Sequence, residues 1–512
     1  MTSPARSIVV LDFGGQYTQL IARRIREARV FSVVLAPNAS AEEIRKHNPA
    51  GVILSGGPQS VYEEDAPVPG VDPQTLDLPL LGLCYGMQWI ARELGGEVVP
   101  SNGREFGRAA ARVEPSEVFS GLDREQTVWM SHGDSVLAAP PGWRVIASTD
   151  ATPIAAFESP DRRTYGIQFH PEVRHTEHGT EILQNFLFRV CGVKPDWTMA
   201  GFREEKIRQI REQAPSGAVI CALSGGVDSS VTALLLREAL GERVHPILVD
   251  HGLMRAHEKD QVVEAFRSLG IAVNAVDASE LFLSRLAGVT DPEEKRKIIG
   301  RTFIDVFAQE ARAIPDARYL AQGTLYPDVI ESVSIKGPSA VIKTHHNVGG
   351  LPEKLGFELI EPVRELFKDE VRLLGAELGL PREFLARHPF PGPGLAVRIP
   401  GEVTREKVAM LQKADEIVLE EIRSAGLYDA ISQAFAVLLP VRSVGVMGDG
   451  RTHEHVLAVR AVQTTDFMTA DWFRMPHEVL DSIARRIVSS VRGINRIVYD
   501  VTSKPPATIE WE

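Results

Sequence analysis

The fold of the first part of this chain is decided by a nine-residue stretch, Leu80-Leu81-Gly82-Leu83-Cys84-Tyr85-Gly86-Met87-Gln88. An apolar strand ends here, and a helix predicted over residues 87–94 follows. Glycine on both sides of the cysteine permits a tight turn, because glycine has no Cβ that could clash. Such a strand–turn–helix junction exposes a nucleophile, and a helix N-terminus favours its thiolate form. We therefore expect Cys84 to be a nucleophile.

A base for this nucleophile is predicted in the segment Tyr165-Gly166-Ile167-Gln168-Phe169-His170-Pro171-Glu172. His170 would deprotonate Cys84. Glu172 lies two residues further on, so it points to the same side of an extended chain and can fix the imidazole tautomer. The three residues form a candidate catalytic triad.

An oxyanion hole is predicted next to the triad. Residues 53–58, Ile-Leu-Ser-Gly-Gly-Pro, indicate a strand followed by a glycine turn. The amides of Gly57 and Tyr85 could then face the acyl oxygen. The alternative interpretation is a buried cysteine, an ordinary glycine turn and a surface His-Pro pair.

The Gly-Leu-Cys-Tyr-Gly and Phe-His-Pro-Glu segments resemble the class I glutamine amidotransferase family, whose cysteine hydrolyses glutamine to glutamate and ammonia. The resemblance implies that Gln88 helps to bind glutamine. It also implies that His132 and Asp134 belong to a loop near the α-amino and carboxylate groups of the substrate. From spacing alone, a polar turn at 131–134 explains these two residues equally well.

A second signature begins the next part of the chain. The apolar run 218–223 is followed by Ser224, Gly225, Gly226, Val227, Asp228, Ser229 and Ser230, and then by a helix predicted over 231–240. Strand, glycine-rich loop and helix together form a phosphate cradle. No Gly-Lys-Ser or Gly-Lys-Thr follows, so this is not a Walker-type loop. A generic Gly-Ser turn is the alternative.

Ser-Gly-Gly-Val-Asp-Ser-Ser resembles the ATP pyrophosphatase family, in which the loop holds the departing pyrophosphate. The resemblance implies that ATP is a co-substrate. Asp228 is then the candidate Mg²⁺ ligand, because an uncompensated carboxylate would repel the nucleotide. Val249, at the end of the strand predicted over 245–250, would border the adenine at the carboxyl edge of the sheet. A core valine is the alternative.

Four later segments, at 295–300, 322–332, 343–352 and 504–512, resemble the glutamine-hydrolysing GMP synthetase family in order and in spacing. The resemblance implies that ATP adenylates the oxygen at carbon 2 of XMP and that ammonia then displaces AMP. The XMP contacts that it implies are Arg296, Lys343, His345, His346, Lys504 and Glu510. Cations are expected around XMP, because a nucleotide phosphate carries about two negative charges and the chain has a net charge of −12.

Two simpler interpretations of this basic region remain. The cluster at 293–297, which includes Arg296 and Lys297, could be a solvated helix face. His345 and His346 could suggest zinc, but no nearby cysteine or histidine completes a ligand set, so we expect no metal there.

Composition limits the cellular setting. Three cysteines in 512 residues form no disulfide framework, which is typical of a reducing cytoplasm. No apolar stretch has the length of a membrane span, and we expect no signal peptide before the strand at 7–11. The acidic balance argues against nonspecific nucleic-acid binding.

The predicted fold is α/β, with two doubly wound, mainly parallel-sheet domains and a small C-terminal α+β domain. We expect an amidotransferase domain at 1–192, an adenylating domain at 193–388, and a dimerisation and XMP-binding domain at 389–512. The limits fall where Gly and Pro interrupt the strand–helix alternation. The last domain should leave one sheet face uncovered, and a homodimer would cover it.

Two other functions compete with this interpretation. One is a different pyrophosphatase-type ligase, such as an NAD synthetase or a tRNA-modifying enzyme. The segment 343–350, Lys-Thr-His-His-Asn-Val-Gly-Gly, and the lack of a basic RNA-binding extension argue against it. The other is a noncatalytic regulator, which the complete set of Cys84, His170 and Glu172 disfavours.

Overall fold

The computed structural model describes residues 6–333, 356–447, 450–464, 467 and 469–512. It divides into two compact units, one of residues 1–202 and 326–340 and the other of residues 203–325 and 341–512. Among the described residues, no helix is both long and apolar enough to cross a bilayer.

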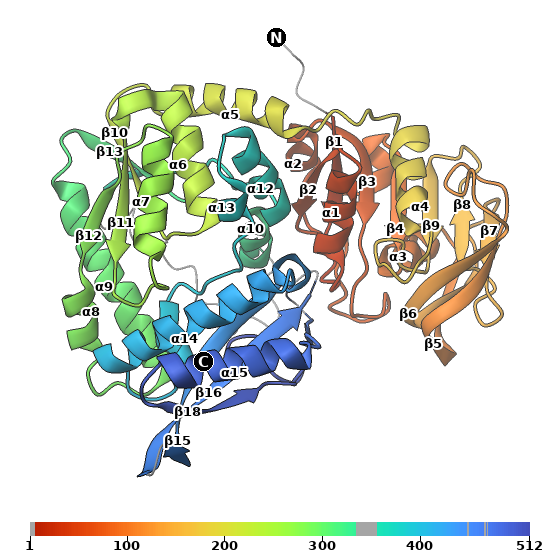
Figure 1. The fold of residues 1–512 in the computed structure, drawn as a ribbon. Coiled ribbons are helices and arrows are strands. Elements are labelled where there is room, and N and C mark those ends of the chain that lie inside the picture. Colours follow the sequence, from red (N-terminus) through yellow and green to blue (C-terminus); the bar gives the residue numbers. More distant parts are fainter. Residues whose placement is uncertain (1–5, 334–355, 448–449, 465–466, 468) are drawn as a thin grey trace. The chain divides into compact units, whose positions relative to one another are not determined.

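The first unit is built on a nine-stranded sheet with the strand order β2-β1-β3-β4-β9-β8-β7-β5-β6 (Figure 1). Its strands are β1 (Ser7–Leu11), β2 (Phe31–Leu35), β3 (Pro49–Leu54), β4 (Leu80–Leu83), β5 (Glu97–Val113), β6 (Glu125–Ala138), β7 (Arg144–Ser148), β8 (Ala156–Glu158) and β9 (Thr164–Ile167). The first five strands in spatial order are parallel, as the sequence predicts. The remaining pairs are antiparallel, which adds an extension that the sequence analysis did not predict.

Helices cover both faces of the parallel strands. Ile8 and Val10 of β1 pack with α1 (Thr18–Glu27) and α4 (Gly179–Asn185), whereas Val9 and Leu11 face the core that contains α2 (Ala41–Lys46) and α3 (Tyr85–Glu93). Burial on both faces explains why these strands are continuous apolar runs.

The second unit contains a parallel sheet with the order β12-β11-β10-β13-β14. Its strands are β10 (Ala218–Leu223), β11 (Val244–Asp250), β12 (Asn274–Asp277), β13 (Ala317–Ala321) and β14 (Glu358–Ile360). The strand predicted over 218–223 is confirmed. The following helix, α6 (Val227–Leu240), begins four residues earlier than predicted, so Asp228 lies in its first turn.

The other helices that follow α4 are α5 (Met199–Gln213), α7 (Glu258–Ser268), α8 (Ser279–Leu286), α9 (Pro292–Arg312), α10 (Tyr326–Val333), α12 (Lys368–Glu377) and α13 (Arg382–Leu385). Among them, α8 and α9 contribute Phe282, Ile299 and Phe307 to the core beneath the parallel sheet of the second unit.

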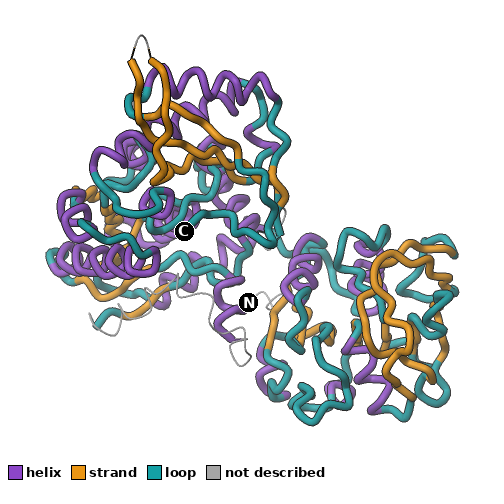
Figure 2. Tube along the Cα trace, turned by 90° about the horizontal axis from the view of Figure 1, so that it is seen from below, coloured by secondary structure: helices purple, strands orange, loops and turns teal. Residues whose placement is uncertain are grey.

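The C-terminal part of this unit is α+β, as predicted. Its strands are β15 (Gln433–Met447), β16 (Gly450–Gln463), β17 (Asp471–Trp472) and β18 (Ile494–Tyr499), and its helices α14 (Arg405–Ser424) and α15 (His477–Ser490) lie side by side on one face of the sheet (Figure 1). Figure 2 shows the long hairpin of β15 and β16 projecting at the edge of the unit. The helix α14 was not predicted.

One hydrophobic core connects the parallel sheet of the second unit with its C-terminal part. It contains Ile220 and Ile247 of the parallel sheet together with Leu411 of α14 and Ile483 of α15. This continuity joins the two sides of the limit predicted at residue 388. The predicted domain limits at 192 and 388 stay predictions.

Candidate functional site

Cys84 lies at the junction of β4 and α3, with φ of 50° and ψ of −105°. Positive φ is uncommon for a residue other than glycine and marks a strained turn. A Cβ on Gly82 would lie 2.5 Å from the backbone of Gly86, and a Cβ on Gly86 would lie 2.5 Å from the carbonyl oxygen of Leu54. Both positions therefore require glycine, for the steric reason that the sequence suggested.

His170 and Glu172 lie beside this turn. The Nδ1 atom of His170 is 2.7 Å from Oε1 of Glu172. The backbone of His170 is held by Trp129, whose carbonyl oxygen accepts its N–H at 3.0 Å, and by Thr176, whose hydroxyl donates to its carbonyl oxygen at 2.6 Å. The structure therefore brings the three predicted triad residues together.

The surroundings of His170 stabilise its protonated form next to the sulfur of Cys84. Burial by itself would lower the pKa of His170, but the charge and hydrogen bond of Glu172 and the interaction with Cys84 raise that pKa well above its usual value. A protonated imidazole beside a cysteine is the arrangement that stabilises a thiolate.

Gly57 and Tyr85, the predicted oxyanion pair, are in contact. A Cβ on Gly57 would lie 3.2 Å from Cγ of Tyr85 and 2.9 Å from the carbonyl oxygen of Phe13. Tyr85 is the first residue of α3, and the first amides of a helix have no acceptor within the helix. The adjacent Gly56 borders the triad itself, because its Cβ would lie 3.6 Å from Cε1 of His170 and 3.7 Å from Cβ of Cys84.

The predicted glutamine-binding residues form one buried cluster. Nε2 of Gln88 donates to the carbonyl oxygen of Asp134 at 2.9 Å, and Nδ1 of His132 lies 2.9 Å from the same oxygen. The expectation that residues 131–134 form a loop or turn is wrong, because they lie within β6 and are paired with β5. Burial lowers the pKa of His132, which keeps that ring neutral at pH 7.

Several polar atoms in this cluster are buried without a hydrogen-bond partner among the described residues. They are Nε2 of His132, Oδ2 of Asp134 and Oε2 of Glu172. Unpaired buried polar atoms cost free energy, and a polar substrate could satisfy them.

Gln168 also belongs to this site, although the sequence analysis did not select it. Its side chain is fully buried, its Nε2 donates to the sulfur of Cys84 at 3.6 Å, and its Oε1 accepts from Nε2 of Gln88 at 3.2 Å. The signal was available, because a glutamine between apolar residues of the predicted strand end has no apolar reason to be buried.

The second site is the loop between β10 and α6. Gly225 has φ of 79°, and the hydroxyls of Ser229 and Ser230 donate to the carbonyl oxygen of Gly226 at 3.2 and 2.9 Å. The amide of Ser224 donates to the hydroxyl of Ser229 at 3.2 Å. These bonds close the loop over the N-terminus of a 14-residue helix, where an anion is favoured.

Asp228 places a carboxylate in the first turn of this helix. Its Oδ2 lies 3.5 Å from Nζ of Lys368, and its Oδ1 is buried without a hydrogen-bond partner among the described residues. Lys368, at the start of α12, is a cation that the sequence analysis missed, because it lies 140 positions away in the chain. The described residues hold no cluster of three metal-ligating side chains. Val249 is only 2% exposed and packs in the core.

The predicted XMP contacts are differently placed. Arg296 lies on α9 and pairs with Glu293 at 3.1 Å. Nζ of Lys504 donates to the carbonyl oxygen of Phe467 at 2.7 Å. Glu510 accepts two hydrogen bonds from Arg398, at 2.9 and 3.1 Å. Lys343, His345 and His346 lie outside the described residues.

Lys295, next to Arg296, is fully buried and was missed. Its Nζ donates to the carbonyl oxygen of Ile399 at 2.8 Å and to Glu512 at 2.5 Å. The helical periodicity of the sequence could have indicated that Lys295 is buried, since Lys295 shares a helical face with Ile299 and Thr302.

Comparison with known proteins places these sites in known families. Residues 9–190 match the glutamine amidotransferase class-I family, residues 202–298 match the NAD synthase family, and residues 420–511 match the GMP synthase C terminal domain family.

Full-length relatives are named GMP synthase [glutamine-hydrolyzing]. The protein of Aquifex aeolicus is 55% identical, covering 99% of each chain, and that of Phenylobacterium zucineum is 57% identical, covering 100% of this chain and 99% of the relative. The protein of Chlorobaculum tepidum is 54% identical over the full length of both chains.

Glu172→Gln is expected to slow alkylation of Cys84. Without the carboxylate charge, burial dominates and the pKa of His170 falls, so the imidazolium that stabilises the thiolate is lost near neutral pH. We expect iodoacetamide labelling at pH 6.5 to slow by about tenfold, the effect of one pKa unit. The difference should narrow at alkaline pH, where any thiol ionises. The labelling rate from pH 5.5 to 9.5, followed by mass spectrometry, checks this.

Glu177→Gln is the matched control, because Glu177 is exposed in the same loop. Cys84→Ala supplies the blank. Background labelling should be low, because burial raises the pKa of Cys221 to about 12 and also raises that of Cys191. Equal pH profiles for the parent and Glu172→Gln would mean that Glu172 does not control the charge of His170.

Proposed function

Because the chain belongs to the family of glutamine-hydrolysing GMP synthases, we propose that it makes GMP from XMP, with glutamine as the nitrogen donor and ATP as the activating co-substrate. The observation that supports this proposal is that one chain combines Cys84, His170 and Glu172 around a strand–helix turn with a glycine-rich loop at 224–230 before a helix. Such a chain is a carbon–nitrogen ligase.

The amidotransferase reaction follows from the positions of the triad residues. The thiolate of Cys84 attacks the side-chain amide carbon of glutamine, and His170 transfers a proton to the nitrogen that leaves as ammonia. Water then attacks the resulting thioester with His170 as base, which releases glutamate and restores the thiol. Glu172 holds the imidazole in the required orientation through its 2.7 Å contact.

The buried polar atoms around the triad fit the other parts of glutamine. The amides of Gly57 and Tyr85 would stabilise the oxyanion. Nε2 of His132 and Oδ2 of Asp134, both buried without hydrogen-bond partners among the described residues, are acceptors suited to the α-amino group, because the proton of the neutral His132 ring lies on Nδ1 beside the carbonyl oxygen of Asp134. Gln88 would position these groups, since it already donates to the backbone of Asp134.

The loop 224–230 would hold the β and γ phosphates of ATP. The oxygen at carbon 2 of XMP attacks the α-phosphorus, the α–β bond breaks, and pyrophosphate leaves into the loop. Ammonia then attacks carbon 2, and AMP leaves with the oxygen. The helix N-terminus is suited to this binding, and the hydroxyls of Ser229 and Ser230 hold the loop in place through the carbonyl oxygen of Gly226. Val249 would border the adenine.

The residues present fit a magnesium ion that binds mainly through the nucleotide. Oδ1 of Asp228 is a buried carboxylate oxygen without a partner among the described residues, and Mg²⁺ is commonly held by one or two carboxylates together with phosphate oxygens. When bound, the ion would neutralise charge on the pyrophosphate. Lys368, 3.5 Å from Asp228, is placed to contact the same phosphates.

XMP is assigned to the second unit. We propose contacts from Arg296, Lys504 and Glu510, and also from Lys343, His345 and His346. The matching C-terminal domain family and the cationic side chains of Arg296, Lys343 and Lys504 support the assignment. The predicted limit at 192 lies two residues after the end of the amidotransferase match at 190, and we propose both 192 and 388 as functional limits.

Other functions are less well supported. An NAD synthetase would also match the family at 202–298, but the relatives that match the whole chain are GMP synthases. A noncatalytic regulator would not need the strained Cys84 turn.

We propose a homodimer formed through the C-terminal part. Val444 and Val446 alternate along β15 on one face of the projecting hairpin and are 61% and 76% exposed. A second copy of the chain could bury this apolar strand face. We place the enzyme in the cytoplasm, because its three cysteines are free thiols.

Cys84→Ala and Asp228→Asn form a contrasting pair of variants. Cys84→Ala should lose glutamine-dependent GMP synthesis by at least about a thousandfold while keeping synthesis from ammonium salts. Asp228→Asn should impair synthesis with both nitrogen sources, because it removes a metal-binding charge from the loop. AMP and pyrophosphate release with XMP measures both. Loss of ammonia-dependent synthesis in a folded Cys84→Ala variant would contradict the division of labour.

Lys504→Ala should weaken the binding of XMP to the enzyme. A charge-assisted hydrogen bond is worth about 1.5 to 3 kcal/mol, so the half-saturating XMP concentration should rise about tenfold or more. The ATP requirement and glutamine hydrolysis should change little. Lys413→Ala is the control, because Lys413 is an exposed lysine of the same unit. An XMP titration equal to that of the parent would remove Lys504 from the site.

Val446→Glu should dissociate the dimer, because it puts a charge on the proposed apolar interface. We expect sedimentation equilibrium to give a dimer for the parent and a monomer for Val446→Glu at micromolar concentration. Leu281→Glu, which changes an exposed apolar residue on α8, should remain dimeric. A dimeric Val446→Glu variant would place the interface elsewhere.

A further inference from the structure

Three fully buried cations hold the last five residues of the chain. Arg460 donates to the carbonyl oxygens of residues 508 and 509, at 2.9 and 2.7 Å. Arg398 holds Glu510 through two hydrogen bonds, and Lys295 holds Glu512. Each of these three side chains has 0% exposure. A C-terminal segment is ordinarily poorly ordered unless it is tied down, so this segment is fixed by the charges of the second unit.

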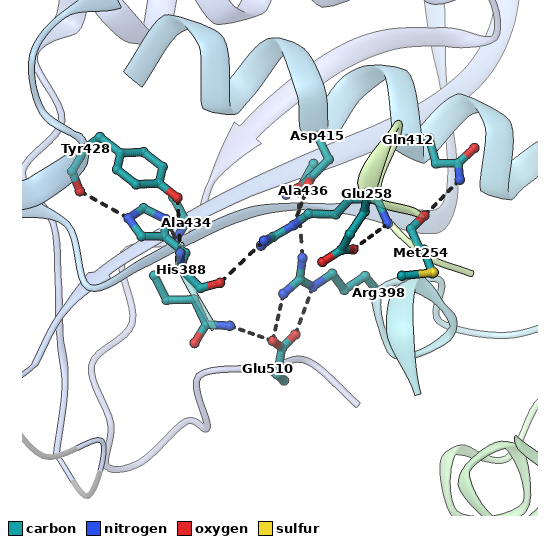
Figure 3. A network of polar contacts seen from close by, with 12 residues as sticks. Met254, Glu258, His388, Arg398, Gln412, Asp415, Tyr428, Ala434, Ala436 and Glu510 are labelled. Carbon is teal, nitrogen blue, oxygen red and sulfur yellow. Dashed lines mark hydrogen bonds and ion pairs between the residues drawn. The ribbon is translucent and has the colours of Figure 1, made fainter. Parts of the chain in front are cut away.

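Of these three cations, Arg398 is connected through other side chains to the loop 224–230. Figure 3 shows Arg398 between Glu510 and Asp415, a buried residue of α14. Nη1 of Arg398 lies 3.9 Å from Oδ1 of Asp415, whose Oδ2 is 3.4 Å from Nε of Arg255. Arg255 and Arg398 also share the ring of Phe390, at 4.7 and 5.1 Å from its centroid.

The connection continues to the pyrophosphate loop. The backbone amide of Arg255 donates to Oε2 of Glu258, the buried first residue of α7, at 3.2 Å. The other oxygen of Glu258 lies beside the loop, because a Cβ on Gly225 would be 3.5 Å from Oε1. A series of charged residues therefore runs from Glu510 to Glu258 beside Gly225, and its members Arg398, Asp415 and Glu258 are buried.

The ion pairs in the middle of this series are long. Four buried atoms have no hydrogen-bond partner among the described residues: Nε and Nη2 of Arg255, Nη1 of Arg398 and Oδ2 of Asp415. A buried polar network that is only partly satisfied is costly, and it gains most when a small movement completes its bonds. Phosphates bound at Gly225 would lie next to the Glu258 carboxylate and shift the groups attached to it.

We propose that Asp415 and Arg398 are positioning residues that couple ATP binding at the loop 224–230 to XMP binding at the C-terminal segment. The inference rests on the proposed function, which supplies the two ligands. ATP at the loop displaces Glu258 and draws Arg255 toward Asp415. Asp415 then orients Arg398, and Arg398 fixes Glu510 for XMP. Because coupling between two sites is reciprocal, XMP must strengthen ATP binding by the same factor.

The experiment measures this coupling without turnover. Titration calorimetry gives the Kd of Mg²⁺ with α,β-methylene-ATP, whose α–β bond cannot be cleaved, in the presence and absence of saturating XMP. We expect XMP to tighten binding in the parent by at least about fivefold, the lower end of usual coupling strengths. In Asp415→Asn and Arg398→Lys the ratio should fall below about twofold. Arg398→Lys keeps the positive charge but cannot form the bidentate hydrogen bonds to Glu510.

Arg460→Lys is the matched control. It loosens the same C-terminal segment from an equally buried position, but Arg460 pairs with Asp500, outside the series that reaches Gly225. XMP should bind more weakly to Arg460→Lys, yet the coupling ratio should remain at the parent value. A purely structural role for Arg398 would instead make the two arginine variants alike.

Several results separate the possibilities. Equal ratios in the parent, Asp415→Asn and Arg398→Lys would overturn the proposal, as would a parent that binds both ligands without coupling. A parent that binds the ATP analogue but not XMP would instead refute the proposed substrate. If melting temperatures show that the variants at 398 and 415 do not fold, Glu258→Gln carries the same test at the loop end of the series, with loss of coupling expected.

Discussion

The chemistry of both units depends on one backbone constraint, the turn from the carboxyl end of a parallel strand into a helix. At β4 this turn contains a single residue, Cys84, so its backbone is forced to positive φ and the two neighbouring glycines have no room for a Cβ. At β10 the turn is longer, and the hydroxyls of Ser229 and Ser230 close it onto the carbonyl oxygen of Gly226 at the N-terminus of α6. The short turn presents a nucleophile, whereas the longer one forms an anion site.

The residues that support these turns come from distant parts of the chain. His170 and Glu172 follow β9, which is hydrogen-bonded to β4 in the sheet, so strand pairing delivers the base to the nucleophile. Lys368 reaches Asp228 from the start of α12. In each case the side chains come together only when the strands of the sheet have paired. The site is therefore a consequence of strand order rather than of local sequence.

Buried charge organises the C-terminal part of the second unit in a similar way. Burying a cation is costly unless it is paired and hydrogen-bonded. Arg460, Arg398 and Lys295 all meet this requirement by binding the final residues of the chain. Removing the last five residues would take hydrogen-bond acceptors away from all three buried cations, so the terminal segment is part of the folded core. The same contacts explain why part of the sheet face expected to be free is covered, since Ile509 packs on Phe435 and Val437.

The sequence by itself determined the turns and strands that depend only on neighbouring residues. Gly82 and Gly86 indicated the Cys84 turn because only glycine fits there, and the apolar runs at 7–11 and 218–223 gave strands with the predicted ends. The tertiary structure decided everything that depends on partners far away in the chain. Residues 131–134 were expected in a loop but lie in a strand, because pairing with β5 extends them. Lys295 lies in a cluster that could have been a solvated helix face, and Arg398 was not selected from the sequence. Both are buried, because the acidic side chains that neutralise them come from residues 512 and 510.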